Sequence, residues 1–264
     1  MQELPSFLDL GTRSQKPRRC GVTHVLDKGS SIDHVEGLLA QAGDLIDVVK
    51  VGWGIGYVDR LLSERVRLYR RAGIIVTLGG TLLEIAFQQG RLDELCRWAQ
   101  RCGIDALEVS NGLGAMGPRT KRRLIEMLAT DFTVLAEAGS KDGSAPVIPA
   151  QWLVEMEEDL GAGARWVIAE GRESGTVGLY RADGSIRDDL VDALASRVCV
   201  ERIIFEAPQK AQQAWFIRRF GANVNLGNVA PDEVLPLETL RIGLRADTAE
   251  LAIPAALVPA QALG

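Results

Sequence analysis

Cysteine and histidine are scarce in this sequence, which limits the kinds of site that it can build. Its 264 residues include four cysteines and two histidines, and no two cysteines form a CxxC pair. A zinc site needs Cys and His ligands that lie closer together along the chain, and a core of this size needs no disulfides. We therefore expect buried or inert thiols at Cys20, Cys96, Cys102 and Cys199.

Long apolar runs and a strong excess of one charge are also absent. The longest apolar stretches, such as 44–51 and 74–78, are bounded or interrupted by Asp, Lys or Gly and fall well short of the roughly 20 residues that cross a bilayer. Residues 1–10 lack the basic-then-apolar pattern of a secretory signal, so we expect a cytoplasmic location and no membrane partner. The net charge is −5. The one basic cluster, Arg13–Arg19, has no interleaved aromatics, so we expect a solvated arm and no nucleic-acid partner.

Short apolar runs alternate with longer amphipathic stretches along the chain, of which 47% is hydrophobic. The runs are nearly continuous in Val, Ile and Leu, which is typical of parallel strands buried on both faces. The amphipathic stretches have helical length, and glycine follows several of them, at 43, 73, 103 and 221. The expected strands are 22–26, 46–51, 74–78, 106–109, 133–137, 166–170, 202–205 and 223–226. The expected helices are 31–42, 57–72, 82–102, 117–129, 149–162, 187–196, 209–220 and 231–243.

About eight strand–helix units in a chain of this length predict an α/β fold, a (β/α)8 TIM barrel that forms one domain. A doubly wound open sheet is the alternative. The sequence has neither GxGxxG after its first strand nor GxxxxGK[ST] anywhere, so the nucleotide-binding versions of that sheet lose their usual signal. We expect residues 1–20 to form an N-terminal arm, 21–245 the catalytic barrel and 246–264 a C-terminal tail.

Polar residues stand at or just after the end of every expected strand, where a TIM barrel carries its active site. A charge at a strand end in an apolar barrel is costly unless it is paired, solvated or bound to a ligand. Pairing across the barrel top would explain any one of them, but so many together favour a site. The acidic members are Glu108, Glu137, Glu170, Glu173 and Glu206. The basic members are Lys28, Lys50, Lys141, Arg172 and Lys210, and the uncharged members include Ser174, Asn225, Gly227 and Asn228.

The mixed signs of these charges suggest a small anionic substrate bound together with a divalent metal. Carboxylates offer the hard oxygen ligands that Mg²⁺ prefers, and Lys and Arg suit phosphate, carboxylate or sulfonate. Barrels often hold phosphate near the last two strands. His24 lies within the first expected strand, so we interpret it as a lining or core histidine rather than a metal ligand. Trp53, between two glycines, is either a pocket wall or a hydrophobe at the barrel rim.

Several long motifs lie between Lys16 and Thr248. They are KPRRCGVTHVLDKG (16–29), DVVKVGWG (47–54), GGTLLEIA (79–86), EGRESGTVGLY (170–180), FEAPQKAQQ (205–213) and VNLGNVAPDEVLPLETLRIGLRADT (224–248). With these motifs the chain resembles the phosphosulfolactate synthase family of carbon–sulfur lyases. The resemblance implies a (β/α)8 barrel that adds sulfite to C3 of phosphoenolpyruvate with Mg²⁺. The product would be (2R)-2-O-phospho-3-sulfolactate, in the first step of coenzyme M biosynthesis.

The resemblance also suggests roles for single residues. Lys141 lies where the family carries a lysine proposed as the acid that protonates C2, and we expect Glu137 and Lys50 beside it. Glu108 and Glu137 are the expected Mg²⁺ ligands, with Glu170 and Glu206 as further ligands or as partners of the cations. The expected substrate-binding residues are Lys28, Arg172, Glu173, Ser174, Lys210, Asn225, Gly227 and Asn228, among which Arg172 and Lys210, together with Lys50, would hold the anionic groups.

Four positions depart from the usual motifs of the family. Ile55 and Gly56 replace two hydroxyl residues, Asn111 replaces a carboxylate, and Ser140 replaces one of two adjacent lysines. If these residues line the nucleophile pocket, they favour a related lyase that adds another nucleophile to an enol phosphate. A third hypothesis is a non-catalytic, stress-associated homologue. Barrels of this type usually associate through their outer helices, so we also expect a homo-oligomer.

Overall fold

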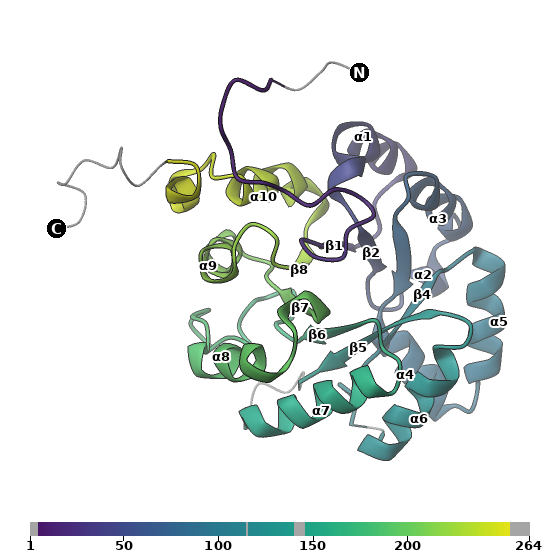
Figure 1. Cartoon of the computed structure of the whole chain (residues 1–264). Helices are drawn as coiled ribbons and strands as arrows, with labels where there is room; N and C mark the ends of the chain where they lie inside the picture. Colours follow the sequence, from purple (N-terminus) through teal and green to yellow (C-terminus); the bar gives the residue numbers. More distant parts are fainter. Residues whose placement is uncertain (1–4, 115, 140–145, 254–264) are drawn as a thin grey trace.

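Eight parallel strands close into a barrel in chain order, with β8 paired to β1 (Figure 1). The computed structural model describes residues 5–114, 116–139 and 146–253. The strands are β1 (Thr23–Asp27), β2 (Val48–Val51), β3 (Ile75–Leu78), β4 (Ala106–Val109), β5 (Thr133–Ala138), β6 (Trp166–Ala169), β7 (Ile203–Glu206) and β8 (Leu226–Val229). The predicted (β/α)8 barrel is therefore confirmed, and the doubly wound sheet is excluded.

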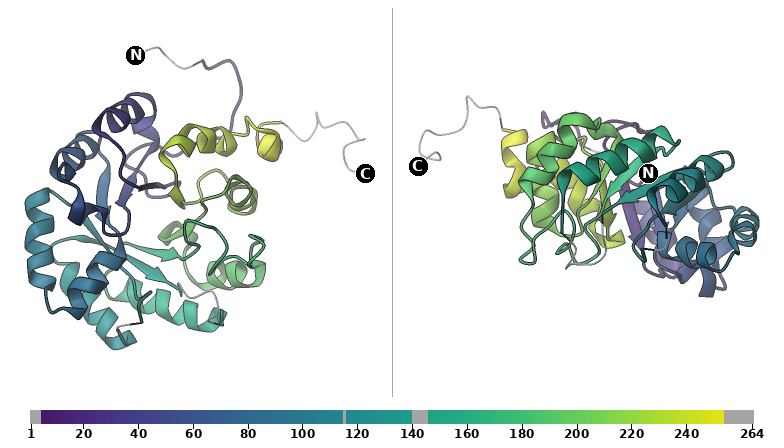
Figure 2. Two further views of the ribbon diagram at one scale, coloured as in Figure 1. Left: turned by 180° about the vertical axis from the view of Figure 1, so that it is seen from behind. Right: turned by 90° about the horizontal axis from the view of Figure 1, so that it is seen from below.

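Helices surround the strands on all sides, as the reverse view in Figure 2 also shows. They are α1 (Ile32–Ala42), α2 (Ile55–Val58), α3 (Leu62–Arg71), α4 (Gly80–Gln88), α5 (Leu92–Cys102), α6 (Pro118–Leu128), α7 (Pro149–Gly161), α8 (Asp188–Arg197), α9 (Lys210–Phe220) and α10 (Val234–Arg241). Short 3-10 turns lie at η1 (Gly43–Leu45), η2 (Val200–Arg202), η3 (Pro231–Glu233) and η4 (Ala246–Leu251). In the described part of the chain, no helix has both the length and the apolar character that a bilayer span requires.

Three expected elements differ from the structure: two expected helices are each divided in two, and one strand starts later than expected. The expected helix 82–102 is two helices, because Gly90 has a φ of +65° that a helix cannot contain. The expected helix 57–72 is likewise two, divided where the Asp59 side chain accepts a hydrogen bond from the backbone of Leu61. Strand β8 begins three residues later than 223–226 implies, and it contains Gly227 and Asn228. A strand with polar residues at its end is hard to recognise from an apolar run.

The barrel interior explains how apolar strands deliver charged groups to one end. A cluster of apolar side chains fills the interior: Val22, Val48, Ala106, Leu135, Trp166, Ile168 and Ile204. Side chains two residues apart on a strand point to the same face. The residues two positions after Val48, Ala106, Leu135, Ile168 and Ile204 are Lys50, Glu108, Glu137, Glu170 and Glu206. Inside the barrel, a layer of apolar side chains is therefore followed, toward the carboxyl ends of the strands, by a layer of charged side chains.

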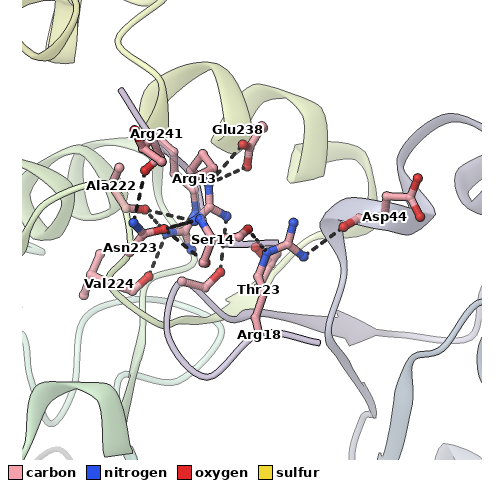
Figure 3. A network of polar contacts seen from close by, with 12 residues as sticks. Arg13, Ser14, Arg18, Thr23, Asp44, Ala222, Asn223, Val224, Glu238 and Arg241 are labelled. Carbon is pink, nitrogen blue, oxygen red and sulfur yellow. Dashed lines mark hydrogen bonds and ion pairs between the residues drawn. The ribbon is translucent and has the colours of Figure 1, made fainter. Parts of the chain in front are cut away.

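The basic N-terminal segment packs on the barrel instead of forming a solvated arm, so that expectation is wrong. It passes α10 before it reaches β1 (Figures 1 and 2). The Arg13 Nε lies 3.0 Å from Glu238 Oε1 on α10, and Arg18 Nη1 lies 3.2 Å from Asp47 Oδ1. Both arginines also donate to backbone carbonyls (Figure 3). The segment supplies donors at the barrel end where several helices finish.

Candidate active site

A cavity of about 350 Å³ opens at the carboxyl ends of the strands. This is the end at which TIM barrels carry out their chemistry. Its lining combines buried charges with glycine-rich loops. The lining residues are Leu26, Lys50, Trp53, Gly79, Gly80, Thr81, Glu108, Gly112, Leu113, Glu137, Glu170, Arg172, Glu173, Glu206 and Asn228.

Lys50 lies between two carboxylates at the centre of the cavity floor. Its Nζ is 3.1 Å from Glu108 Oε2 and 3.0 Å from Glu206 Oε1. Burial by itself lowers the pKa of Lys50, but the carboxylates of Glu108 and Glu206 outweigh it and raise the pKa well above the ordinary value. Lys50 is therefore a fixed cation and is not suited to exchange protons during a reaction.

The acidic side chains also fix the loops that form the rim. Glu108 Oε1 accepts the Gly80 N–H at 2.9 Å, which ties β4 to the start of α4. Glu206 Oε2 accepts the N–H groups of both Gly171 and Arg172 at 2.9 Å, and Glu170 Oε1 accepts the Arg172 N–H at 2.7 Å. The carboxylates thus hold the loops after β3 and β6 in place around Lys50.

Backbone strain is concentrated at this cavity. Among the described residues, the non-glycine residues with positive φ are Trp53 (48°), Arg172 (56°) and Asn228 (54°), and all three line the cavity. Such a conformation is uncommon for residues with a Cβ and persists only where the surroundings enforce it. Strain of this kind gathers at functional sites, so it marks the cavity independently of its charges.

Two cations are available to an anionic ligand at the rim. Within the described residues, the Arg172 guanidinium has no hydrogen bond and no ion pair, although its backbone is anchored. Lys28 extends its Nζ over the Trp53 ring, 5.9 Å from the centroid. The Asp27 carboxylate fixes the turn that carries Lys28 by accepting the N–H groups of Gly29 and Ser30. An anion at the rim therefore meets cations whose backbones are already ordered.

His24 is buried inside the barrel and is neutral. Burial first, and then the charge of Lys50, lower its pKa to about 4. Its Nδ1 accepts the Asn228 N–H at 3.4 Å, at the point where the pairing between β1 and β8 shifts register. It does not belong to the cavity lining.

Most of the predicted site residues that the structure describes meet at the cavity, but five are absent from its lining. Lys28 lies beside the cavity, over the Trp53 ring, and the other four lie elsewhere. Lys210 points away and pairs with Asp247 at 2.9 Å. Asn225 bonds to the backbone of Val22, Glu201 and Ile203, because β8 starts only after it. Ser174 is exposed and bonds to Thr176. Gly227 lies below the rim, where an added Cβ would come within 3.1 Å of His24 Nδ1.

Five further residues that the sequence analysis singled out do not line the cavity in the described part of the chain. Lys141 and Ser140 lie outside the described residues. Ile55 and Gly56 belong to α2, and a Cβ on Gly56 would contact Leu78 and Trp98. Asn111 bonds both backbone groups of Met116. Ile55, Gly56 and Asn111 are therefore absent from the cavity lining.

Two residues that the strand-end pattern does not identify hold the long loop after β6. The Tyr180 hydroxyl donates to the Glu206 carbonyl, and Gln212 Nε2 on α9 donates to the Gly175 carbonyl at 2.8 Å. Both side chains are buried. Each residue lies in one of the long motifs, EGRESGTVGLY and FEAPQKAQQ, which was the only signal available in the sequence.

The donor set at the cavity fits Mg²⁺. Glu108, Glu137, Glu170 and Glu206 all line it and are 1–4% exposed. Among the described residues, no three His, Cys, Asp or Glu side chains form a ready ligand cluster. Mg²⁺ does not need one, since it usually takes one or two carboxylates together with waters and substrate phosphate oxygens. Glu137, with Glu108 or Glu170, could supply such a pair.

A family model described as (2R)-phospho-3-sulfolactate synthase (ComA) matches residues 11–247. Phosphosulfolactate synthase of Methanothermobacter thermautotrophicus is 42% identical over 242 residues, which cover 89% of this chain and 94% of the relative. That of Bacillus subtilis is 38% identical over 244 residues, or 91% and 97% of the two chains. Protein HEAT-STRESS-ASSOCIATED 32 of Arabidopsis thaliana is 23% identical over 266 residues, or 89% and 91%.

Solved structures agree with the fold. The YdjI aldolase of Escherichia coli K12 is similar with a TM-score of 0.55 at 14% identity, covering 89% of each chain. The 3-keto-L-gulonate-6-phosphate decarboxylase of Vibrio cholerae is similar with a TM-score of 0.54 at 12% identity, covering 89% of this chain and 100% of the other. Identities this low show the barrel architecture alone.

Proposed function

The chain belongs to the (2R)-phospho-3-sulfolactate synthase family, and is thus a lyase, and we propose that its cavity adds sulfite to C3 of phosphoenolpyruvate with the help of Mg²⁺. The product is (2R)-2-O-phospho-3-sulfolactate, which would enter coenzyme M biosynthesis. The observation that carries the proposal is the placement of two cations on one cavity with four buried carboxylates: Lys50, which two of the carboxylates fix, and Arg172, whose guanidinium has no partner among the described residues.

The reaction brings together two strongly anionic molecules, so binding is the first task of the site. The Arg172 guanidinium suits a phosphate or carboxylate because its planar fork donates two parallel hydrogen bonds. Lys28, whose ammonium group lies over Trp53 at the rim, adds a second cation on a flexible four-carbon side chain. Lys50 contributes positive charge at the cavity floor. Because Lys50 is buried, its electrostatic attraction for an anion is stronger there than in water.

The chemistry itself needs charge stabilisation and one proton. The sulfite lone pair forms the C–S bond to C3, while the C2–C3 π pair moves through C2 into the carboxylate as an enediolate. Fixed cations aimed at the developing charge lower this barrier, and one such donor is commonly worth about 3–4 kcal/mol. An acid then delivers a proton to C2 on one face. We assign this step to Lys141 because the family carries a proposed acid at this position.

Mg²⁺ would be held by Glu137 with Glu108 or Glu170. When bound, it supplies a Lewis acid that neutralises charge on the substrate oxygens. Lys50 keeps Glu108 and Glu206 at their places on the floor, so this chain's own residues maintain the geometry of the donor set.

One assay tests the proposal. The protein is incubated with phosphoenolpyruvate, Mg²⁺ and sulfite, and the sulfonated phosphoester is detected by mass, with omission of each component as a control. Other nucleophiles are then offered in place of sulfite. Product with another nucleophile and none with sulfite would favour the related lyase, which gains no support from Ile55, Gly56 and Asn111 because they do not line the cavity. No product with any nucleophile would favour a non-catalytic homologue.

Lys141→Ala tests the proton donor. We expect turnover to fall by about 10²–10⁴-fold, which is typical of a lost general acid, while phosphoenolpyruvate still binds. Normal turnover would contradict the assignment. The homo-oligomer and the cytoplasmic location stay predictions, of which the first is testable by mass measurement in solution.

A further inference from the structure

A buried lysine lies directly behind the strand end that carries Glu137. Lys121 belongs to α6 and is 3% exposed. Its Nζ donates to the Glu137 carbonyl at 2.8 Å, to Glu155 Oε1 at 2.6 Å and to Asp159 Oδ2 at 2.7 Å. An ammonium group has three hydrogens, so its hydrogen-bonding capacity is fully used by one carbonyl and two carboxylates.

The arrangement joins three elements at one point. Glu137 is near the end of β5, Lys121 is on α6, and both carboxylates are on α7. The last register pair between β4 and β5 is Val109 with Ala136, so Lys121 reaches the Glu137 carbonyl where β4 has already ended. The Glu137 side chain lines the cavity, while its carbonyl is held from outside the barrel.

Such a cluster is not the simplest way to join two helices to a strand. Burying charges costs desolvation free energy that their attraction often fails to exceed, and apolar side chains of similar size frequently do as well or better. The neighbouring pair Arg122 and Glu158 also links α6 to α7, but its side chains are about 40% exposed and lie 3.6 Å apart, and within the described chain neither has a hydrogen bond to β5. The contact that distinguishes Lys121 is the one to Glu137.

We propose that Lys121 is a positioning residue for Glu137, and that Glu155 and Asp159 hold its ammonium group in place for this task. The proposal rests on the proposed function for the role of Glu137 itself. A displacement of about 1 Å at a catalytic group can cost on the order of 10²-fold in rate. At Glu137, β5 is still paired with β6 but no longer with β4, so the Lys121 ammonium group holds the strand on the side where β4 has ended, and its loss is expected to move Glu137.

The charge states support the geometry. Burial by itself lowers the pKa of Lys121, but Glu155 and Asp159 reverse the effect and raise it, so the ammonium form persists. Burial raises the pKa of Asp159 to about 6, against the lowering effect of Lys121. The Asp159 carboxyl is therefore ionised at neutral pH, beside the Lys121 ammonium group.

Lys121→Met tests the proposal, because methionine keeps the length of the side chain and removes its donors. We expect kcat to fall by about tenfold to a hundredfold while KM for phosphoenolpyruvate changes less than threefold. Lys121→Arg restores donors and should recover part of kcat. Asp159→Asn, which keeps an acceptor, should also lower kcat, but by a smaller factor. This variant replaces Lys121→Met in the test if Lys121→Met does not fold.

Two control variants separate positioning from stability. Arg122→Met removes the exposed link between the same helices, and Arg241→Met weakens the opposite end of the barrel; both should keep kcat within twofold at a temperature where each variant is folded. If Lys121→Met, or Asp159→Asn in its place, keeps the kcat of these controls, the proposal is overturned.

Hydrogen exchange gives a readout that does not depend on turnover. In Lys121→Met, amides near the end of β5 should exchange at least tenfold faster, while those of β1 and β2 keep their protection. Unchanged exchange at β5 overturns the positioning role. A wild-type protein that forms no product contradicts the proposed function instead, and the exchange comparison still decides the role of Lys121.

Discussion

The two ends of the barrel use buried charges for opposite purposes. At the amino end, Arg241 is fully buried and donates to the carbonyls of Ala222, Val224 and Val22 (Figure 3). Lys16 donates to the carbonyls of Gly43 and Ala72, which follow α1 and α3. Helix C-termini leave carbonyls without partners and carry partial negative charge, so cations at this end complete the fold.

At the carboxyl end the polarity is reversed, because helices begin there and present N–H groups. Glu108 accepts the N–H of Gly80 at the start of α4, Glu206 accepts that of Gly171 in the loop after β6, and the same two carboxylates hold Lys50. This end also has a cavity, residues with positive φ and the guanidinium of Arg172, which is unpaired within the described part of the chain. Burial of charge alone therefore does not identify the active site; burial together with strain and an unpaired cation does.

The largest effect is expected from Lys50→Met, which disrupts the carboxyl end. It leaves Glu108 and Glu206 buried without their shared cation, which costs about 3–5 kcal/mol of stability, and it removes positive charge from the cavity floor. We expect kcat/KM to fall by more than about 10²-fold, measured in the sulfite assay alongside urea unfolding. Near-normal turnover would show that Lys50 serves only the fold, as the arginines of the amino end do.

Arg172→Ala should act on binding alone. The guanidinium has no hydrogen bond or ion pair to any described residue, so its loss leaves nothing unpaired, and the unfolding midpoint should stay within error. We expect KM for phosphoenolpyruvate to rise by about 10–100-fold, as for a lost charge-assisted contact. An unchanged KM would rule out the anion clamp.

Arg241→Met disrupts the amino end and should give the opposite result. Three carbonyls lose a charged donor, for which we expect about 4 kcal/mol of stability to be lost, measured by denaturant unfolding. The values of kcat and KM should stay within twofold. A large loss of kcat in folded protein would contradict the claim that buried charges at the amino end serve stability alone.

The smallest expected effect is a change in how stability depends on pH. His24 has a pKa of about 4 in the folded chain, against 6.5 in its ordinary state. As the pH falls from 6.5 to 4, the unfolded chain binds a proton that the folded chain does not, so about 3 kcal/mol of stability is lost. His24→Leu should flatten the curve over this interval, whereas exposed His34→Gln, the other histidine, should not. An equal slope in both variants would contradict the buried, neutral state of His24.

Much of this site follows from the periodicity of the strands. Glu108, Glu137, Glu170 and Glu206 each stand two residues after an interior apolar residue, so an apolar run that ends in an acid predicts a charged layer on an apolar floor. Eight such runs separated by helical stretches predict the barrel. Local sequence was sufficient here because strand geometry alone fixes which face a residue occupies.

The failures share a different cause. Lys210 and Asn225 have the same residue types as true cavity residues, but one pairs with Asp247 and the other bonds to the backbone before β8 begins. Arg13 and Arg18 are predicted to be solvated, yet they donate hydrogen bonds to the carbonyls of Ala222 and Asp44, which lie far from them along the chain. No local pattern contains the position of these partners.

The sequence by itself determined the order of the elements, the barrel and the layer of acids around Lys50, since these depend on alternation within each strand and on spacing between strands. Only the tertiary structure decided which cations face the cavity, which arginines complete the amino end, and that Lys121 meets Glu137. Those outcomes depend on which donors and acceptors come within about 3 Å of each other after the chain has closed on itself, and partners far apart in the chain leave no periodic trace in it.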